Sequence, residues 1–434
     1  MSISSSLLSL KNKYLRAMEG PGFIKYLKNS GWMFVARVVS LVISFFVTTY
    51  IARYLGPYNY GQLSYAISFV ALFSFISTLG IDSVLYREIL RYSEKKDIYI
   101  GSALVLKLLA GLLASLLSII TAYLTGTHDV ALLLIAIISF TFIFNSFNII
   151  VFEFQAAVES KIPSIIAVVV TLILSFAKVA VVVFDKGIIY LSLVLLLESI
   201  LYAGLYIVFR IKKYGSISNW SFDKNIAVSI MKDSWPMMFG SAFALVYARI
   251  DQVFIKSLVD VQSVGIYDAA VRLSEVWYFL PNILLASLFP AIMNARGTNL
   301  STYYKRMKYV LLLMIILSFS IAIPTTFFAK EIVHIVFGPA FIGSYIILQI
   351  YIWSLAGTYI NHAISYFLIA ENYRKMIFTS SLVGMILNVI LNILLIPRYG
   401  ISGAAIATLI SYTMGPLSLI CYREFRYKLR LILA

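Results

Sequence analysis

Long apolar runs, separated by short polar or glycine-containing breaks, occupy most of this chain. A membrane-spanning helix needs about 20 predominantly apolar residues, so each run of roughly that length is a candidate span. Twelve runs qualify: 31–52, 63–86, 101–124, 130–151, 163–184, 187–209, 233–256, 264–289, 309–328, 345–369, 376–396 and 401–422. The pattern predicts an all-α polytopic membrane protein with about 12 transmembrane helices.

Two pairs of runs are joined by links so short that each pair could form one long helix. These links are Asp185-Lys186 and the stretch from Pro397 to Gly400. A continuous apolar helix of about 40 residues would greatly exceed the thickness of a bilayer. We therefore expect helical hairpins at both places.

Composition excludes a water-soluble globule. Of the 434 residues, 61% are hydrophobic and 12% are charged, against roughly 45–50% and about 25% in soluble domains. The net charge of +16 would suit nucleic acid if it formed one face of a folded domain. Here the basic residues lie in short clusters between apolar runs, so we expect membrane lipids and no nucleic acid as partners. The one cysteine, Cys421, excludes a disulfide framework.

Basic residues are distributed unequally between the two ends of the predicted spans. With the N-terminus in the cytoplasm, 25 Lys and Arg residues fall on the cytoplasmic side and five on the opposite side. This positive-inside distribution predicts a multi-pass protein of the cytoplasmic (inner) membrane with both termini cytoplasmic. The five external residues are Arg53, Lys186, Lys256, Lys330 and Arg398. The remaining five lie within spans: Arg37, Lys107, Lys178, Arg249 and Arg272.

The longest break divides the predicted helices into two groups of six. The expected organisation is a cytoplasmic N-terminal segment (1–30), an N-lobe of helices 1–6 (31–210), a cytoplasmic linker (211–232), a C-lobe of helices 7–12 (233–422) and a cytoplasmic tail (423–434). The halves resemble each other, since Trp32 and Trp235 are 203 residues apart and Gly61 and Gly265 are 204 apart. Because six is an even number, both halves enter the membrane in the same orientation, which predicts parallel repeats.

Motifs for catalysis or ATP hydrolysis are absent from the sequence. It has neither a Gly-x-x-x-x-Gly-Lys-Ser/Thr loop nor a His-Glu-x-x-His motif. Its three histidines, His128, His334 and His362, lie on separate segments, where packing or interfacial roles are a better interpretation than metal binding. We therefore expect a protein that is not an enzyme and that uses no cofactor or metal.

Charged residues inside the predicted spans are the functional candidates. Each costs about 2.5–3.5 kcal/mol at mid-membrane on insertion scales. The clearest candidates are Arg37, Lys178, Glu198, Arg249, Asp251, Asp268, Arg272 and Glu275. Asp82, Lys107 and Glu153 lie near cytoplasmic ends of spans, so we expect their side chains to extend to the interface.

The predicted helix 264–289 is the most informative. Asp268, Arg272 and Glu275 have i, i+4, i+7 spacing and therefore share one face. These charged side chains are kept from lipid only if that face packs against other helices or borders a water-filled space. Pro281 then interrupts the backbone hydrogen-bond ladder, either as a bend used in transport or as a static kink.

Several short motifs occur in the order and spacing of a known family. The first half contains Ala52-Arg53-Tyr54-Leu55-Gly56-Pro57-Tyr58-Asn59-Tyr60-Gly61, then Leu79-Gly80-Ile81-Asp82 ahead of Arg87-Glu88. The second half contains Trp235-Pro236, Arg249-Ile250-Asp251-Gln252, Val264-Gly265-Ile266-Tyr267, Arg272-Leu273-Ser274-Glu275, Leu280-Pro281, Leu288-Phe289-Pro290 and Tyr399-Gly400-Ile401-Ser402-Gly403-Ala404-Ala405-Ile406-Ala407-Thr408. Over nearly its whole length the chain thereby resembles the polysaccharide transporter branch of the multidrug/oligosaccharidyl-lipid/polysaccharide (MOP) flippase superfamily.

This resemblance implies a Wzx-type translocase with two six-helix lobes around a central cavity. Such a protein moves an undecaprenyl-pyrophosphate-linked oligosaccharide to the outer leaflet for O-antigen, capsule or exopolysaccharide assembly. Its implied partners are the lipid-linked oligosaccharide, membrane lipids and other polysaccharide assembly proteins. In that family, basic residues of the cavity are expected to meet the pyrophosphate or acidic sugars. By position, the substrate-binding candidates here are Arg37, Lys178, Arg249 and Arg272.

Without an ATP motif, an ion gradient or passive equilibration must drive the transport. The candidate ion-coupling carboxylates are Asp251, Glu198, Asp268 and Glu275. We hypothesise that Asp251 pairs with Arg272 in one conformation and separates from it in the other, so that proton or sodium binding at Asp251 competes with the pair. A static structural pair is the alternative.

Three other functions are compatible with the architecture to different degrees. A multidrug and toxin extrusion (MATE) antiporter would favour acidic residues in its cavity because its substrates are cationic, and Arg37 and Lys178 argue against it. A lipid II flippase would usually carry two additional helices, for which twelve segments leave no room. A membrane scaffold without transport is disfavoured by the cost of so many charges inside the spans.

Overall fold

The computed structural model describes residues 21–371 and 373–433, and every regular element within them is helical. This confirms the predicted all-α class. Most of the expected N-terminal segment, residues 1–20, and the last residue of the expected tail, 434, lie outside the described residues.

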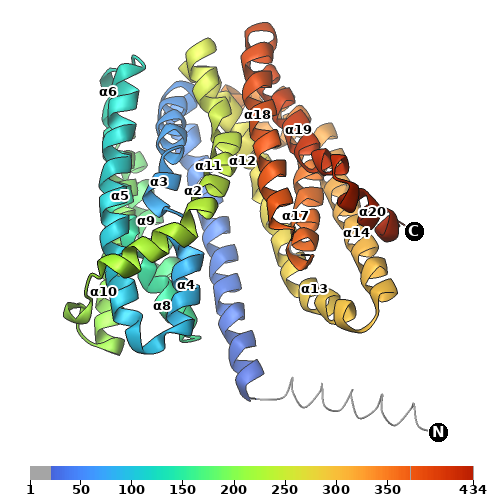
Figure 1. Cartoon of the computed structure of the whole chain (residues 1–434). Helices are drawn as coiled ribbons and strands as arrows, with labels where there is room; N and C mark the ends of the chain where they lie inside the picture. Colours follow the sequence, from blue (N-terminus) through green and yellow to red (C-terminus); the bar gives the residue numbers. More distant parts are fainter. Residues whose placement is uncertain (1–20, 372, 434) are drawn as a thin grey trace.

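The first half of the described chain forms an N-lobe, drawn in blue to green in Figure 1. Its helices are α2 (Pro21–Ala71), α3 (Ser74–Thr78), α4 (Ile81–Arg91), η1 (Ser93–Lys95), α5 (Lys96–Leu124), α6 (Asp129–Ser139), α7 (Thr141–Asn145), η2 (Ser146–Asn148), α8 (Ile149–Ala156), α9 (Lys161–Val183) and α10 (Ile188–Tyr214). The short η3 (Ile217–Asn219) lies in the linker that follows. Elements marked η are 3₁₀ helices.

The second half forms a C-lobe, drawn in yellow to red. Its helices are α11 (Lys224–Leu258), α12 (Val261–Glu275), η4 (Val276–Tyr278), α13 (Phe279–Thr298), α14 (Leu300–Phe327), α15 (Ala329–Phe337), η5 (Pro339–Phe341), α16 (Ser344–Tyr351), α17 (Ser354–Ala370), α18 (Arg374–Tyr399), α19 (Ile401–Leu417), η6 (Ser418–Cys421) and α20 (Arg423–Leu433). In Figure 1 the first part of α11 lies against the N-lobe, where it packs on α4 and α5. The remaining C-lobe ribbons approach the N-lobe at the upper end and diverge from it toward the lower end, where α13 joins α14.

Ten helical stretches of the described residues are long and apolar enough to cross a membrane. Two local features account for the difference from the twelve predicted spans. Gly56 has a φ of 67° and a ψ of 172° and precedes Pro57, so α2 contains two helices that change direction there. A break at residues 352–353 divides the predicted span 345–369 between α16 and α17.

Both hairpins expected at short links are confirmed. Helix α9 ends at Val183 and α10 begins at Ile188, while only Gly400 separates α18 from α19. Helices α18 and α19 then pack against each other along their length, as do α9 and α10. Bilayer thickness therefore limited helix length here, as the sequence predicted.

Several spans are interrupted at membrane depth. The chain leaves helical geometry at residues 72–73 and 79–80 between α2, α3 and α4, and it tightens into 3₁₀ turns at η2 and η4. Pro281 follows η4 in the first turn of α13, where a proline removes no intrahelical hydrogen bond. Irregular backbone is tolerated in a membrane only where protein buries it or a cavity adjoins it. These interruptions therefore indicate where polar space lies inside the lobes.

The lobes meet where α2 crosses α12. A Cβ atom added to Gly61 would meet the backbone carbonyl of Val261, and one added to Gly265 would meet the backbone carbonyl of Pro57. Only glycine at both positions allows two helix backbones to approach this closely. These are the two glycines that occupy matching positions in the sequence halves.

The linker between the lobes is fixed to the N-lobe. The buried guanidinium of Arg210 donates to the carbonyls of Gly215 and Ser216, at 2.8 Å each, and pairs with Glu153 at 3.2 Å. Glu153 is itself buried, and Lys96 is its second basic partner. The prediction that Glu153 extends to the interface is therefore wrong, because its charge is compensated inside the lobe.

The predicted orientation can be tested at three exposed positions. In a Cys421→Ser background, single cysteines at Ser218 and Thr298 should be shielded from a membrane-impermeant thiol reagent in intact cells, whereas one at Lys186 should react. The first two lie on the side that carries the excess of Lys and Arg. Permeabilised cells provide the control, since all three should then react. Labelling of Ser218→Cys in intact cells would overturn the orientation.

Candidate functional site

The carboxylate of Asp268 on α12 joins the two lobes. Within the N-lobe, Tyr60 and Ser64 on α2 donate hydrogen bonds to it at 2.6 and 3.0 Å. Within the C-lobe, Gln252 donates at 2.8 Å and Arg272 pairs with it at 2.7 Å. Asp268 is buried, and its carboxylate interacts with all four of these side chains. The helix face predicted to avoid lipid thus lies at a protein seam at this position.

A cavity of about 220 Å³ adjoins this contact between the lobes. Its lining includes Lys178 from α9, Arg272 from α12 and Tyr60 from α2. Both cations are partly exposed, and Lys178 pairs with Glu198 at 2.9 Å. The cavity therefore brings together two of the four predicted substrate-binding residues.

Three of those four cations have an acidic partner. Besides the pairs of Lys178 and Arg272, Arg249 on α11 pairs with Glu275 on α12 at 3.2 Å. Three of the four carboxylates predicted for ion coupling are thereby the partners of three predicted substrate-binding cations: Glu198, Asp268 and Glu275.

Arg37 on α2 differs from the other three cations. It is exposed, and no acidic side chain among the described residues pairs with it. It lines a cavity of about 330 Å³ within the N-lobe, which we call the Arg37 cavity. A guanidinium in this position keeps its charge and its hydrogen-bond donors available to an anion.

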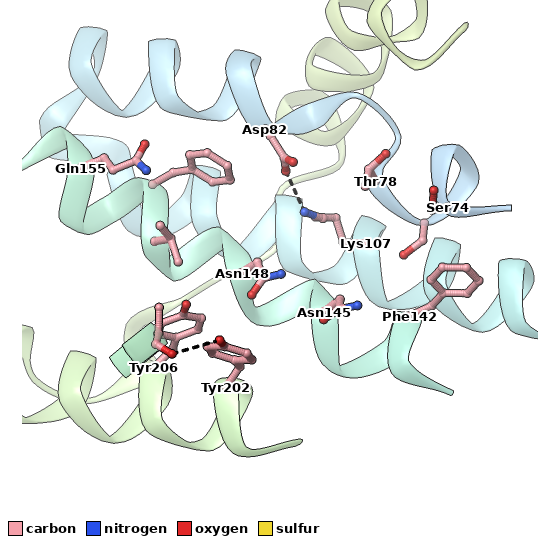
Figure 2. Close-up of a pocket in the computed structure, with 14 residues that line it drawn as sticks. Ser74, Thr78, Asp82, Lys107, Phe142, Asn145, Asn148, Gln155, Tyr202 and Tyr206 are labelled. Atoms are coloured by element: carbon pink, nitrogen blue, oxygen red, sulfur yellow. Dashed lines mark hydrogen bonds and ion pairs between the residues drawn. The ribbon is translucent and has the colours of Figure 1, made fainter. Parts of the chain in front are cut away.

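A larger cavity of about 490 Å³, the N-lobe cavity, lies beside the Arg37 cavity (Figure 2). It is bordered by α3, α4, α5, α7, η2, α8, α9 and α10. The two cavities share the lining residues Val151, Gln155, Ala167, Tyr202 and Tyr206. They are therefore adjacent parts of one polar space.

One ion pair lies in the wall of the N-lobe cavity. Figure 2 shows the ammonium of Lys107 on α5 directed toward the carboxylate of Asp82 on α4, at 2.7 Å. The Lys107 side chain is buried, so the prediction that it extends to the interface is wrong. The pair leaves this wall without net charge.

The sequence interpretation missed three carboxamides in the same cavity. Asn145, Asn148 and Gln155 all come from the interrupted segment α7–η2–α8. The interpretation ranked ionisable residues and passed over neutral ones. Their spacing of 3 and 7 residues within an apolar span was the available signal, because it places them near one face of the segment.

Asp251 on α11 lies in a buried cage of neutral donors. Tyr267 from α12 donates at 2.6 Å and Asn392 from α18 donates at 2.7 Å, while Thr408 from α19 also donates a hydrogen bond. In this structure Arg272 pairs with Asp268 and not with Asp251. The hypothesised Asp251–Arg272 pair, which is expected in one of two conformations, stays a prediction. No basic side chain of the described residues pairs with Asp251.

Polar partners of Asp251 were also missed by the sequence interpretation. Asn388 and Asn392 are four residues apart on α18, and both are fully buried. The Nδ2 of Asn388 and the Oδ1 of Asn392 have no hydrogen-bond partner. Two asparagines with i, i+4 spacing in an apolar helix were the available signal.

The chain is similar to proteins of known families. The family model described as "Polysaccharide biosynthesis protein" matches residues 26–296, which is more than half of the chain. "Probable flippase AglR" of Haloferax volcanii is 25% identical over 410 residues, covering 90% of this chain and 82% of that protein. "Capsular polysaccharide biosynthesis protein CapF" of Staphylococcus aureus is 23% identical over 400 residues, covering 90% and 97%.

Solved structures share the fold. An inward-facing multidrug resistance MATE family transporter of the MOP superfamily superimposes with a TM-score of 0.75 at 13% identity, covering 92% of this chain and 98% of that one. Lipid II flippase MurJ in an inward closed conformation superimposes with a TM-score of 0.70 at 20% identity, covering 94% and 90%. Because the family model covers more than half of the sequence, the chain belongs to the polysaccharide biosynthesis protein family.

Proposed function

We propose that this protein is a flippase that moves undecaprenyl-pyrophosphate-linked oligosaccharide repeat units across the cytoplasmic membrane by alternating access. The names of its relatives support a flippase of glycan assembly. The observation that carries the proposal is Arg37, a cation inside a span that lines a polar cavity and has no acidic partner among the described residues. Such a charge is costly in a membrane unless an anion meets it, and a pyrophosphate is the strongest anion in the proposed substrate.

The arrangement of the lobes supports loading from the cytoplasmic side. Gly61 and Gly265 lie about one turn from the ends of their helices that the Lys and Arg distribution makes external. Their contact and the Asp268 hydrogen bonds close the molecule at that end. Arg37 lies near the opposite end of its span, where a lipid headgroup of the inner leaflet would arrive.

An antiporter of cationic drugs is the main alternative, since a MATE transporter shares the fold. That function requires a carboxylate free to bind a cation in the cavity. Asp82, Glu198 and Glu275 are instead paired with Lys107, Lys178 and Arg249. The charge distribution therefore favours an anionic substrate.

The Arg37→Gln variant should slow translocation about 10-fold or more, because a charge-assisted hydrogen bond contributes about 1.5–3 kcal/mol. The measurement is protection of an undecaprenyl-pyrophosphate-linked oligosaccharide from an impermeant sugar oxidant in vesicles that contain the full chain. Rescue of surface polysaccharide in a flippase-null strain gives the matching cellular result.

Arg398→Gln is the matched control, since this exposed residue at the end of α18 lies on the predicted external side. It should translocate at the wild-type rate. Wild-type translocation by Arg37→Gln, at equal protein level, would refute the role of Arg37. A wild-type chain that translocates no lipid-linked oligosaccharide would refute the function.

The same proposal assigns ion coupling to Asp251. An ionised carboxylate buried among neutral donors is destabilised by several kcal/mol unless a proton or a small cation accompanies it. Asn392 Oδ1 is an unpartnered buried acceptor beside it, as a proton or cation site requires. Neighbouring residues connect this site to the lobe contact, because Tyr267 donates to Asp251 and Gln252 donates to Asp268.

Asp251→Asn should abolish the response of transport to an imposed ion gradient, because the amide cannot bind and release a proton or Na⁺ as the carboxylate does. The measurement compares translocation rates in vesicles with and without a pH or Na⁺ gradient. Asp260→Asn is the control, since this exposed residue caps α12 and asparagine keeps a capping side chain. An undiminished gradient response in Asp251→Asn would remove this residue from coupling.

A further inference from the structure

The N-lobe cavity is built between two interrupted spans. One is the α2–α3–α4 span, and the other is the α6–α7–η2–α8 span. Ser74 and Thr78 on α3 donate to the carbonyls of Ala71 and Phe75, which the interruption leaves near the cavity. Discontinuous helices at membrane depth form the binding sites of many transporters, because they present backbone and polar groups without exposing them to lipid.

A row of free carboxamides faces this cavity. Asn145, Asn148 and Gln155 line it, and within the described part of the chain their side chains have no hydrogen-bond partner. Figure 2 shows all three along the segment that crosses the view between Lys107 and the two tyrosines. Each carboxamide has N–H donors and a C=O acceptor. It can therefore donate to one hydroxyl group and accept from its neighbour.

An aromatic surface lies opposite the carboxamides. The rings of Tyr202 and Tyr206 on α10 are stacked, with centroids 5.8 Å apart and an angle of 28° between their planes. Both rings line the N-lobe cavity and the Arg37 cavity. The electron-rich face of an aromatic ring attracts weakly positive C–H groups, such as those on one face of a pyranose.

Charge and size narrow the class of ligand. Asp82 and Lys107 neutralise each other in the wall, so the cavity has no unpaired charge for a phosphate or an amine among the described residues. Its volume of about 490 Å³ lies within the 300–1,000 Å³ that is usual for small-molecule sites. The lining suits a polyhydroxylated, uncharged molecule with one apolar face.

We propose that the N-lobe cavity binds uncharged sugar residues of the lipid-linked oligosaccharide while the adjacent Arg37 cavity holds its pyrophosphate. This inference rests on the proposed function and adds the part of the substrate that the carboxamides and tyrosines recognise. The shared wall at Tyr202 and Tyr206 places the two parts of one molecule side by side, as a sugar attached directly to a pyrophosphate requires.

The test compares two probes on the full chain in lipid nanodiscs: undecaprenyl pyrophosphate and undecaprenyl pyrophosphate that carries a neutral disaccharide. The wild-type chain should bind the sugar-bearing probe about 10-fold more tightly or better. Asn145→Leu and Asn148→Leu change carboxamides that line the N-lobe cavity and not the Arg37 cavity. Each should lower that affinity about 5- to 10-fold, the effect of losing roughly one or two neutral hydrogen bonds, without changing the affinity for the sugar-free probe. Arg37→Gln should weaken both probes.

Matched variants separate recognition from folding. Asn225→Leu changes an exposed asparagine at the start of α11 and should leave both affinities unchanged. Tyr202→Phe keeps the ring and should keep most of the sugar preference, whereas Tyr202→Leu should lose it. Free disaccharide should compete with the sugar-bearing probe and not with the sugar-free one.

The outcomes distinguish this inference from the proposed function. If the wild-type chain binds both probes equally in an Arg37-dependent way, the sugar site is refuted and the proposed function stands. If Asn145→Leu and Asn148→Leu retain the full sugar preference, the sugar site is again refuted. If the wild-type chain binds neither probe, the proposed function fails and this inference fails with it.

Discussion

The hydrogen bonds to the buried carboxylate of Asp268 are the interaction on which the observed arrangement of the lobes depends. Tyr60 and Ser64 donate to it from one lobe, and Gln252 and Arg272 from the other. A polar contact of this kind can be exchanged for water when the lobes separate, whereas an equally large apolar contact would resist separation in an aqueous cavity. These hydrogen bonds therefore hold the lobes together while water is excluded from the contact, and water can replace them when the lobes separate.

Asp268 is connected to Asp251, the second buried acid, through neighbouring residues on the same two helices. Asp251 and Gln252 are adjacent on α11, and Tyr267 and Asp268 are adjacent on α12. Tyr267 donates to Asp251 while Gln252 donates to Asp268, so two hydrogen bonds cross between the helices in opposite directions. Under the proposed ion coupling, a change in the occupancy of Asp251 would act directly on the residues that hold the lobes together, without a chain of intermediates between distant sites.

Charge pairing distinguishes the cavity at the lobe contact from the polar space within the N-lobe. Lys178, Arg249 and Arg272 each have an acidic partner, which lowers the cost of keeping them in the membrane. Arg37 has none among the described residues, and it borders a space lined by neutral carboxamides and tyrosines. The polar space of the N-lobe therefore offers an unpaired positive charge and neutral hydrogen-bonding groups, whereas Lys178 and Arg272 beside the lobe contact are already paired with carboxylates.

Hydropathy predicted the spans and the hairpins because bilayer thickness limits the length of any apolar helix. It did not predict the break at residues 352–353 or the 3₁₀ turn at Ser146–Asn148, since these depend on packing between helices and leave no periodic signal. The charged candidates were visible because ionisable residues are rare in spans. Their pairing was not, because Lys178 and Glu198, or Lys107 and Asp82, approach through tertiary structure. Neutral residues such as Asn148 and Asn392 were passed over because only ionisable residues were ranked, although their spacing within apolar spans is visible in the sequence.

The contact between Gly61 and Gly265 has a consequence for the origin of the two halves. These glycines hold equivalent positions, 204 residues apart, and each faces the backbone of the other's helix. If the chain arose by duplication of a six-helix unit, one glycine of the ancestral protein met its own copy across the two-fold axis of a homodimer. A single mutation there changed both sides of the interface at once. After the fusion the two positions could mutate independently of each other. The close approach of the two backbones nevertheless still requires glycine at both.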